Sequence, residues 1–238
     1  MSECWGNGTA SFMILGEICT RSCKFCATIT GKPHAIDWDE ADRLADTIRQ
    51  MGLKHCVITS VDRDDLLDLG ASFWAFTIRR VREKNPETTL ETLIPDFNGR
   101  EELIEKVIAA KPEIISHNME TVRRLTPKVR SRAKYDVSLQ TLSIVAASGA
   151  VKPKSGIMVG LGETEPEVLE TMDDLLAAGC KVLTIGQYLQ PSSHHLPVHE
   201  YVPLEQFARY RKEGLAKGFD IVESGPLVRS SYHAEKHV

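Results

Sequence analysis

The stretch that decides the fold and its chemistry is CTRSCKFC, which occupies positions 19–26. It places Cys19, Cys23 and Cys26 on one short loop at the spacing C-x3-C-x2-C. Three thiolates at this spacing can hold three irons of a four-iron cluster and leave the fourth iron without a protein ligand. A fourth ligand from elsewhere in the chain would instead make an electron-transfer cluster or a closed zinc site. The loop therefore predicts a metal site with an open position for chemistry.

Length and composition favour one domain in a reducing compartment. The chain has 238 residues, of which 42% are hydrophobic, enough for one substantial core. We find no apolar run long enough to span a bilayer, and the polar first residues do not resemble a secretory signal. Six cysteines in such a chain indicate reduced thiols and a cytoplasmic location. The net charge of -4 gives no general attraction to nucleic acid.

Strand and helix patterns alternate downstream of the cysteine loop. The expected strands cover residues 55–60, 88–94, 113–117, 154–161 and 182–189, and expected helices cover 41–51, 73–84, 101–110, 135–148 and 203–217. This alternation predicts an α/β fold whose parallel sheet curves into a partial, TIM-like (β/α)6 barrel. We expect residues 12–217 to form the barrel, with a short N-terminal segment, 1–11, before it and a C-terminal extension, 218–238, after it.

Two helix starts carry the pattern of a capping box, in which the first side chain caps the helix and a glutamate bonds back to it. One is DWDE, from Asp37 to Glu40, and the other is TEPE, from Thr164 to Glu167. Each precedes apolar residues at helical spacing. We therefore expect both glutamates to be used in capping.

Polar side chains follow several of the predicted strands, at the end where ligands bind in a barrel. Asp62 begins an acidic turn, and His117 precedes Asn118 and Glu120. Each group is either a satisfied polar turn or a set of ligand contacts, and position alone leaves both open. A glycine-rich segment, 156–163, joins a strand to a capped helix, where backbone amides can approach a ligand.

The cysteine loop, with an aromatic residue just before its last cysteine, resembles the radical S-adenosylmethionine (SAM) superfamily. In that superfamily the open iron is chelated by SAM, and the reduced cluster cleaves SAM to a 5'-deoxyadenosyl radical. The resemblance implies that Phe25 faces the adenine and shields the radical, although such a ring also often fills a core. It implies that the segment 156–163 lines the adenine and ribose.

Longer strings in the same order resemble the lipoyl synthase family over essentially the whole chain. They are CWG at 4–6, CTRSCKFC at 19–26, TSVDRDD at 59–65, ETVR at 120–123, SGIMVGLGE at 155–163, QYLQP at 187–191 and RSSYHA at 229–234. The segment 67–73 departs from the family, which often has a histidine and further glycine there. That departure affects expectations for the local loop and leaves the resemblance intact.

The resemblance implies a sulfurtransferase that inserts sulfur at C6 and C8 of an octanoyl group on a lysine of a lipoyl carrier protein. Expected partners are octanoylated E2 subunits of 2-oxoacid dehydrogenases, the H protein of glycine cleavage, and an electron donor. Two SAM molecules supply the radicals, and a second, auxiliary iron-sulfur cluster supplies sulfur. Another sulfur-inserting radical SAM enzyme, of the biotin synthase kind, remains an alternative, although the RSSYHA string speaks against it.

The resemblance also implies residue roles. Cys19, Cys23 and Cys26 would bind the SAM cluster. Cys4 and Ser231, with Ser230 as the alternative serine, would bind the auxiliary cluster. The residues expected to bind SAM are Phe25, Thr59, Asp62, Asn118, Glu120, Gly160, Glu163 and Gln187.

The family's auxiliary motif, C-x4-C-x5-C, is represented here only by its last cysteine, Cys4. We expect a misassigned start or a shortened chain. As given, the chain is expected to bind SAM and one cluster without holding a complete sulfur donor. A protein that cleaves SAM but cannot donate sulfur is therefore a further alternative.

Basic residues gather between positions 123 and 134 of this acidic chain, namely Arg123, Arg124, Lys128, Arg130, Arg132 and Lys134. Such a run is usually a solvated face. The competing hypothesis is a docking surface that attracts an acidic lipoyl carrier.

Overall fold

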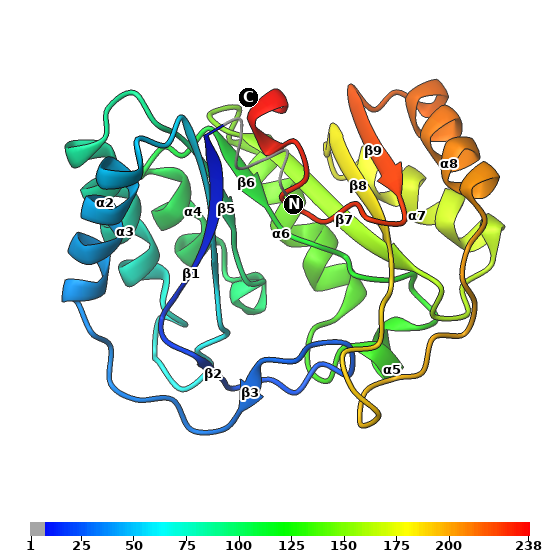
Figure 1. Ribbon diagram of the computed structural model, residues 1–238, viewed down its shortest axis with the longest axis horizontal. Helices are drawn as coiled ribbons and strands as arrows, with labels where there is room; N and C mark the ends of the chain where they lie inside the picture. The colour runs from blue at the N-terminus through cyan, green and yellow to red at the C-terminus, as the bar shows by residue number, and fades with distance from the viewer. Residues whose placement is uncertain (1–7) are drawn as a thin grey trace.

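The computed structural model describes residues 8–238, and within them one parallel sheet organises the chain (Figure 1). Its seven strands lie in the order β1 (Thr9–Ile14), β4 (His55–Ser60), β5 (Thr89–Leu93), β6 (Ile114–Ser116), β7 (Lys152–Val159), β8 (Val182–Gln187) and β9 (Ile221–Gly225). Every neighbouring pair is parallel. The predicted partial α/β barrel is confirmed.

Helices connect the strands and cover the outside of the curved sheet (Figure 1). They are α2 (Asp39–Met51), α3 (Ala71–Lys84), α4 (Glu101–Ile108), α5 (Thr126–Val129), α6 (Tyr135–Ala147), α7 (Glu165–Ala177) and α8 (Leu204–Lys217), with a short 3-10 turn, η1 (Phe97–Gly99), after β5. The buried faces of these helices pack on the sheet through apolar side chains such as Ile48, Phe73 and Met172. No helix among residues 8–238 is both long enough and apolar enough to cross a membrane.

Two strands extend the sheet beyond the sequence pattern. The alternation downstream of the cysteines does not predict β1, which begins at Thr9 and therefore upstream of residue 12. At the other edge, β9 lies in the C-terminal extension and pairs with β8. Because the strand order ends at β1 and β9, the described strands form an open barrel.

The C-terminal tail runs from β9 back toward the start of β1, where it forms the turn η2 (Ala234–Lys236; red in Figure 1). Thr9 Oγ1 donates to Glu235 Oε2 over 3.2 Å. Lys152 Nζ donates to the carbonyl of His237 over 2.6 Å, and the His237 side chain is fully buried. The tail is therefore attached to the first residues of β1 and β7.

The cysteine loop lies at the carboxyl ends of the barrel strands. It is bounded by a small parallel pair, β2 (Ile18–Cys19) and β3 (Ile29–Thr30). The amide of Thr20 donates to the carbonyl of Asp62, just beyond β4, and the amide of Lys24 donates to the carbonyl of Val129 in α5. The fold therefore places the three cysteines at the end of the barrel where ligands are expected.

Candidate functional site

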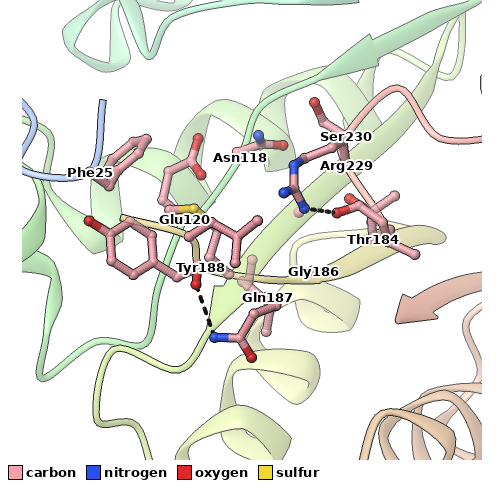
Figure 2. A pocket seen from close by; sticks show the side chains of 14 residues that line it. Phe25, Asn118, Glu120, Thr184, Gly186, Gln187, Tyr188, Arg229 and Ser230 are labelled. Atoms are coloured by element: carbon pink, nitrogen blue, oxygen red, sulfur yellow. Dashed lines mark hydrogen bonds between the residues drawn. The ribbon is translucent and has the colours of Figure 1, made fainter. Parts of the chain in front are cut away.

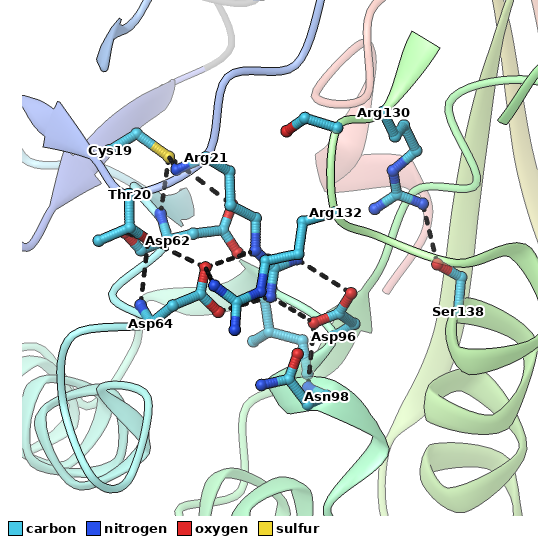
Figure 3. A network of polar contacts seen from close by, with 12 residues as sticks. Cys19, Thr20, Arg21, Asp62, Asp64, Asp96, Asn98, Arg130, Arg132 and Ser138 are labelled. Carbon is cyan, nitrogen blue, oxygen red and sulfur yellow. Dashed lines mark hydrogen bonds and ion pairs between the residues drawn. The ribbon is translucent and has the colours of Figure 1, made fainter. Parts of the chain in front are cut away.

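The sulfur of Cys19 receives backbone hydrogen bonds. The amide of Asp62 donates to Sγ over 3.3 Å, and the amide of Arg21 donates over 3.4 Å (Figure 3). Burial raises the pKa of the Cys19 thiol and also that of Cys23. Amide donors suit a thiolate that is bound to a metal, because they stabilise its negative charge. A metal replaces the thiol proton on binding, so the raised pKa values describe these thiols without metal.

The three cysteines of the loop carry the donor atoms that an iron-sulfur cluster needs. Among residues 8–238, no three Cys, His, Asp or Glu side chains are gathered closely enough to hold one metal ion. Cys19, Cys23 and Cys26 are free of disulfides. A cubane cluster takes one thiolate at each of three separate corners, so its ligands stand farther apart than those of one ion. The donor set of this loop fits the open cluster that its spacing predicts.

A buried charge network ties the loop to two strand ends (Figure 3). The guanidinium of Arg21 makes two hydrogen bonds to Asp64, beyond β4, and two to Asp96, beyond β5. Asp62 lies 3.4 Å from the same group. Although burial opposes it, the Arg21 partnership lowers the pKa of Asp96 to about 2, and it also lowers that of Asp64. Sequence reasoning missed Arg21, whose partners lie far away in the chain.

Beside the loop lies a cavity of about 250 Å³ at the carboxyl ends of β7 and β8 (Figure 2). Phe25, which stands between Cys23 and Cys26, forms part of its wall. Of the predicted SAM-binding residues, Asn118, Glu120 and Gln187 also line it. The cavity therefore brings together four of these residues from three separate parts of the chain.

Glu120 enters this cavity from a strained backbone. Its φ angle is 66°, a left-handed conformation that is costly for a residue with a side chain. The conformation is held because the Glu120 amide donates to the carbonyl of Gly156 over 3.1 Å and its carbonyl accepts from Met158 over 2.8 Å. Burial raises the pKa of the Glu120 carboxyl. Such strain at a cavity wall is typical of a functional position.

Asn118 presents an unsatisfied acceptor. Its Oδ1 is buried and accepts no hydrogen bond from the described part of the chain. A Cβ at Gly156 would lie 3.0 Å from this oxygen, so the glycine leaves room for the amide. A buried polar atom without a partner costs free energy, and a bound ligand that donates to it would recover that cost.

His117, next to Asn118, is a satisfied structural residue. Its Nδ1 lies 2.9 Å from the carbonyl of Ile94, which can only accept, so Nδ1 carries the proton. Its Nε2 accepts from Ser138 Oγ over 2.9 Å, and Arg130 donates to that same hydroxyl oxygen. Burial lowers the pKa of His117 to about 4. Of the two readings of this segment, the polar turn applies to His117, and Asn118 and Glu120 face the cavity.

The other four predicted SAM-binding residues lie outside the lining of this cavity. Asp62 contacts Cys19, and Thr59 lies within β4. Glu163 bonds to the amides of Gly160 and Leu161. Gly160 lies against the side chain of Gln187, where a Cβ would meet Nε2, and this Nε2 donates to the carbonyl of Glu200 over 3.0 Å.

The C-terminal tail closes another side of the cavity. Val228, Arg229 and Ser230 belong to its lining, whereas the expected ligand Ser231 does not. The tail can approach because β8 has Gly186, where a Cβ would lie only 2.2 Å from the carbonyl oxygen of Val228. Cys4, the other expected auxiliary ligand, lies outside the described residues.

Five of the six basic residues between positions 123 and 134 are exposed, and the sixth, Arg130, is buried. Arg130 is buried, and its guanidinium donates a hydrogen bond to Ser138 Oγ. Arg123 pairs with Asp136, and Arg124 pairs with Glu167. The run therefore contains one buried arginine and five exposed cations, two of which form the surface ion pairs just named.

Comparison with known proteins first defines the class. The sequence profile described as "Radical SAM superfamily" matches residues 13–175. Methylornithine synthase (PylB) has a similar fold, with a TM-score of 0.67 at 13% identity over 90% of this chain and 71% of that one. SuiB of Streptococcus suis bound to S-adenosylmethionine gives 0.69 at 11% identity, over 97% of this chain and 54% of that one. Fold and cysteine loop thus define a radical SAM enzyme, with a four-iron cluster and SAM as its cofactors.

The sequence relatives narrow this class. The lipoyl synthase of Bacteroides thetaiotaomicron is 65% identical over the whole chain, which covers 84% of that protein. That of Parabacteroides distasonis is 66% identical, again over 84% of its length. The mitochondrial lipoyl synthase of Nematostella vectensis is 58% identical, with 82% covered. The chain belongs to the lipoyl synthase family.

Proposed function

We propose that this chain inserts sulfur at C6 and C8 of an octanoyl group carried on a lysine of a lipoyl carrier protein. One observation carries the proposal. Phe25 of the cysteine loop also lines the cavity where Asn118, Glu120 and Gln187 gather, so a cluster on the loop would adjoin a polar-lined cavity. Membership of the lipoyl synthase family supports the type of reaction, and the cavity beside the cysteine loop supports its location.

We assign the cluster to Cys19, Cys23 and Cys26. When bound, it would supply the electron that splits SAM into methionine and a 5'-deoxyadenosyl radical able to take hydrogen from an unactivated carbon. The chain itself binds, orients and shields. Asn118 Oδ1 and the Glu120 carboxyl can accept hydrogen bonds from the amino or hydroxyl groups of SAM. The rings of Phe25 and Tyr188 help to exclude water from the radical (Figure 2).

Sulfur would come from an auxiliary cluster whose ligands include Cys4 and a serine of the RSSY string. The tail supports this assignment because Ser230 borders the same cavity and Ser231 follows it. An alkoxide suits iron less well than a thiolate does, which fits an iron that must be released. We propose that the remaining predicted residues contribute to SAM binding indirectly, through the backbone segments around the cavity. These residues are Thr59, Asp62, Gly160 and Glu163.

The proposed carriers are octanoylated E2 domains and the glycine cleavage H protein, with a cellular electron donor that reduces the cluster. A reducing cytoplasm suits the free thiols of the loop. Each carrier must present its octanoyl-lysine arm to the cavity, because the radical has to form next to the target carbons.

The test is anaerobic reconstitution with iron and sulfide, followed by SAM, a reductant and an octanoyl-lysine peptide. We expect 5'-deoxyadenosine from the SAM cluster and, where the auxiliary cluster is loaded as well, a peptide that has gained two sulfur atoms, both detected by mass spectrometry. Cys23→Ala should abolish both products. Cys56→Ala is the matched control, because Cys56 is buried within β4, outside the loop, and should leave both intact.

Two other results would revise the proposal. Deoxyadenosine with iron for one cluster and no sulfur in the peptide would show that residues 1–238 cleave SAM without donating sulfur. If a cluster-loaded chain made no 5'-deoxyadenosine, the proposed radical reaction would be wrong. A product with sulfur on another substrate would favour a different sulfur-inserting enzyme.

A further inference from the structure

Arg21 lies between Cys19 and Cys23, and its side chain is held in a closed arrangement of carboxylates (Figure 3). Nε and Nη2 each lie 2.9 Å from an oxygen of Asp64, while Nη2 and Nη1 lie 2.8 and 3.0 Å from the oxygens of Asp96. Nη1 is also 3.4 Å from Asp62. The N–H donors of one guanidinium are thus directed at three carboxylates.

This group is buried to a degree unusual for an ion pair. The side chains of Arg21, Asp64 and Asp96 are 3%, 4% and 3% exposed. A solvated pair tolerates many geometries, whereas a guanidinium that bonds two carboxylates through both edges has one orientation. Lysine carries the same charge without the planar fork and cannot replace it. The arrangement therefore fixes the orientation of the Arg21 guanidinium as well as the position of its charge.

The backbone next to this fixed side chain contacts the first cysteine. The amide of Arg21 donates to Cys19 Sγ, and so does the amide of Asp62. Thr20, between them, lies within hydrogen-bond distance of the Asp64 side chain and accepts from the Asp64 amide, both over 3.0 Å. Any movement of the Arg21 side chain would therefore shift the donors around that sulfur.

We infer that Arg21 is a positioning residue, which with Asp64 and Asp96 sets the cysteine loop in its ligating shape before any cluster is bound. The inference rests on the proposed role of Cys19, Cys23 and Cys26 as cluster ligands. Arg21 touches neither substrate nor SAM in this role. It acts through the direction of the loop and through the amides on Cys19.

A first test uses the reduced, cluster-free chain and thiol labelling read by peptide mass spectrometry. In Arg21→Lys we expect Cys19 to lose its protection while Cys56 keeps its own, because Cys56 reports opening of the whole barrel. Arg43→Lys is the matched control, since Arg43 pairs with Asp37 on the exposed surface. Equal gains in labelling at Cys19 and Cys56 would show general destabilisation and overturn the inference.

A second test uses the cluster-loaded chain. Removal of a residue that orients metal ligands typically lowers metal affinity by about 10- to 100-fold. We expect a chelator to strip iron from Arg21→Lys and from Asp96→Asn faster than from the wild type by a factor in that range, with a changed electron paramagnetic resonance spectrum of the reduced cluster. Wild-type release rates and spectra in both variants would overturn the inference, since neither the guanidinium fork of Arg21 nor the carboxylate of Asp96 would then be needed.

The two tests separate this inference from the proposed function. If the wild type bound no cluster, the proposed ligand role of the cysteines would fail, and the labelling test would still report whether Arg21 orders the loop. If the wild type loaded a cluster and made product while Arg21→Lys matched it in labelling, iron release and spectrum, only the role of Arg21 would fail.

Discussion

Lys154 Nζ lies 2.7 Å from Glu91 Oε2, and both side chains are essentially sealed from solvent inside the barrel. Ser116 on the intervening strand donates to the other carboxylate oxygen over 2.7 Å. Three neighbouring strands, β5, β6 and β7, are thus joined through their side chains as well as their backbones. Breaking one partner leaves an uncompensated charge in the interior.

We predict that Lys154→Met lowers the free energy of unfolding by about 3–5 kcal/mol because Glu91 is left buried and unpaired. The double variant with Glu91→Leu should regain most of that loss, since it buries no charge. Anaerobic denaturant unfolding measures both. A double variant no more stable than the single one would contradict this account.

His117 predicts a loss of stability in mild acid. Its pKa is lowered from 6.5 to about 4 in the folded chain, so the unfolded chain takes up the proton first as the pH falls. The contribution is present above pH 6.5 and is lost progressively toward pH 4, by about 3 kcal/mol in all. His117→Asn should flatten the pH dependence of the unfolding free energy over this window. An unchanged slope would show that other groups cause it.

Asn118 should contribute to SAM affinity through its unpaired Oδ1. Asn118→Leu removes that acceptor, and one net hydrogen bond of about 1.4 kcal/mol corresponds to roughly tenfold in Kd. Equilibrium dialysis with the cluster-loaded chain measures the change. Gln50→Leu makes the same amide-to-leucine exchange at an exposed site in α2 and should bind as the wild type does. Equal affinity in all three chains would remove Asn118 from the SAM site.

Gly186 should control how the tail lies over the cavity. In Gly186→Ala the new Cβ would meet the Val228 carbonyl, so we expect faster hydrogen exchange in residues 226–238. Gly225 is its register partner on β9, and a Cβ there would lie at an ordinary 3.5 Å from Val228. Gly225→Ala is therefore the matched control. Tail exchange that is equal in the two variants would contradict the close approach.

The two serines of the tail can be told apart by product. If Ser231 is the auxiliary ligand, Ser231→Ala should still make deoxyadenosine and transfer no sulfur, while Ser230→Ala keeps sulfur transfer. Mass spectrometry of both products from each variant decides. The reverse pattern would assign the ligand to Ser230, which borders the cavity.

Local patterns in the sequence predicted those features that depend on neighbouring residues. The box at Thr164 forms with both of its reciprocal bonds. The box at Asp37 was predicted on the same grounds and is wrong, because Glu40 accepts from the amide of Leu15 over 2.8 Å instead. Leu15 has a positive φ of 67° and is buried, so its amide has to be satisfied by a partner from a distant helix. Nothing near Glu40 in the sequence signals that demand.

Burial of charge was the other feature that the sequence did not reveal. The spacing of the cysteines and the strand alternation predicted the site and the barrel, because both are short-range patterns. Arg21 and Arg130 look like solvated cations in the sequence, yet each is buried against partners from other segments. The charge pattern favoured a solvated face, with a carrier docking surface as the competing hypothesis, and it did not indicate that Arg130 would be buried.

The last contacts of the cysteine loop come from late in the chain. The amide of Leu196 donates to the carbonyl of Lys24 over 3.1 Å, and His195 Nε2 lies 3.0 Å from the carbonyl of Cys26. During synthesis the cysteines leave the ribosome long before these partners exist. The loop therefore makes all of its hydrogen bonds only after the segment that follows β8 has been translated. A nascent chain that stops earlier has the three thiols but lacks the contacts from His195 and Leu196.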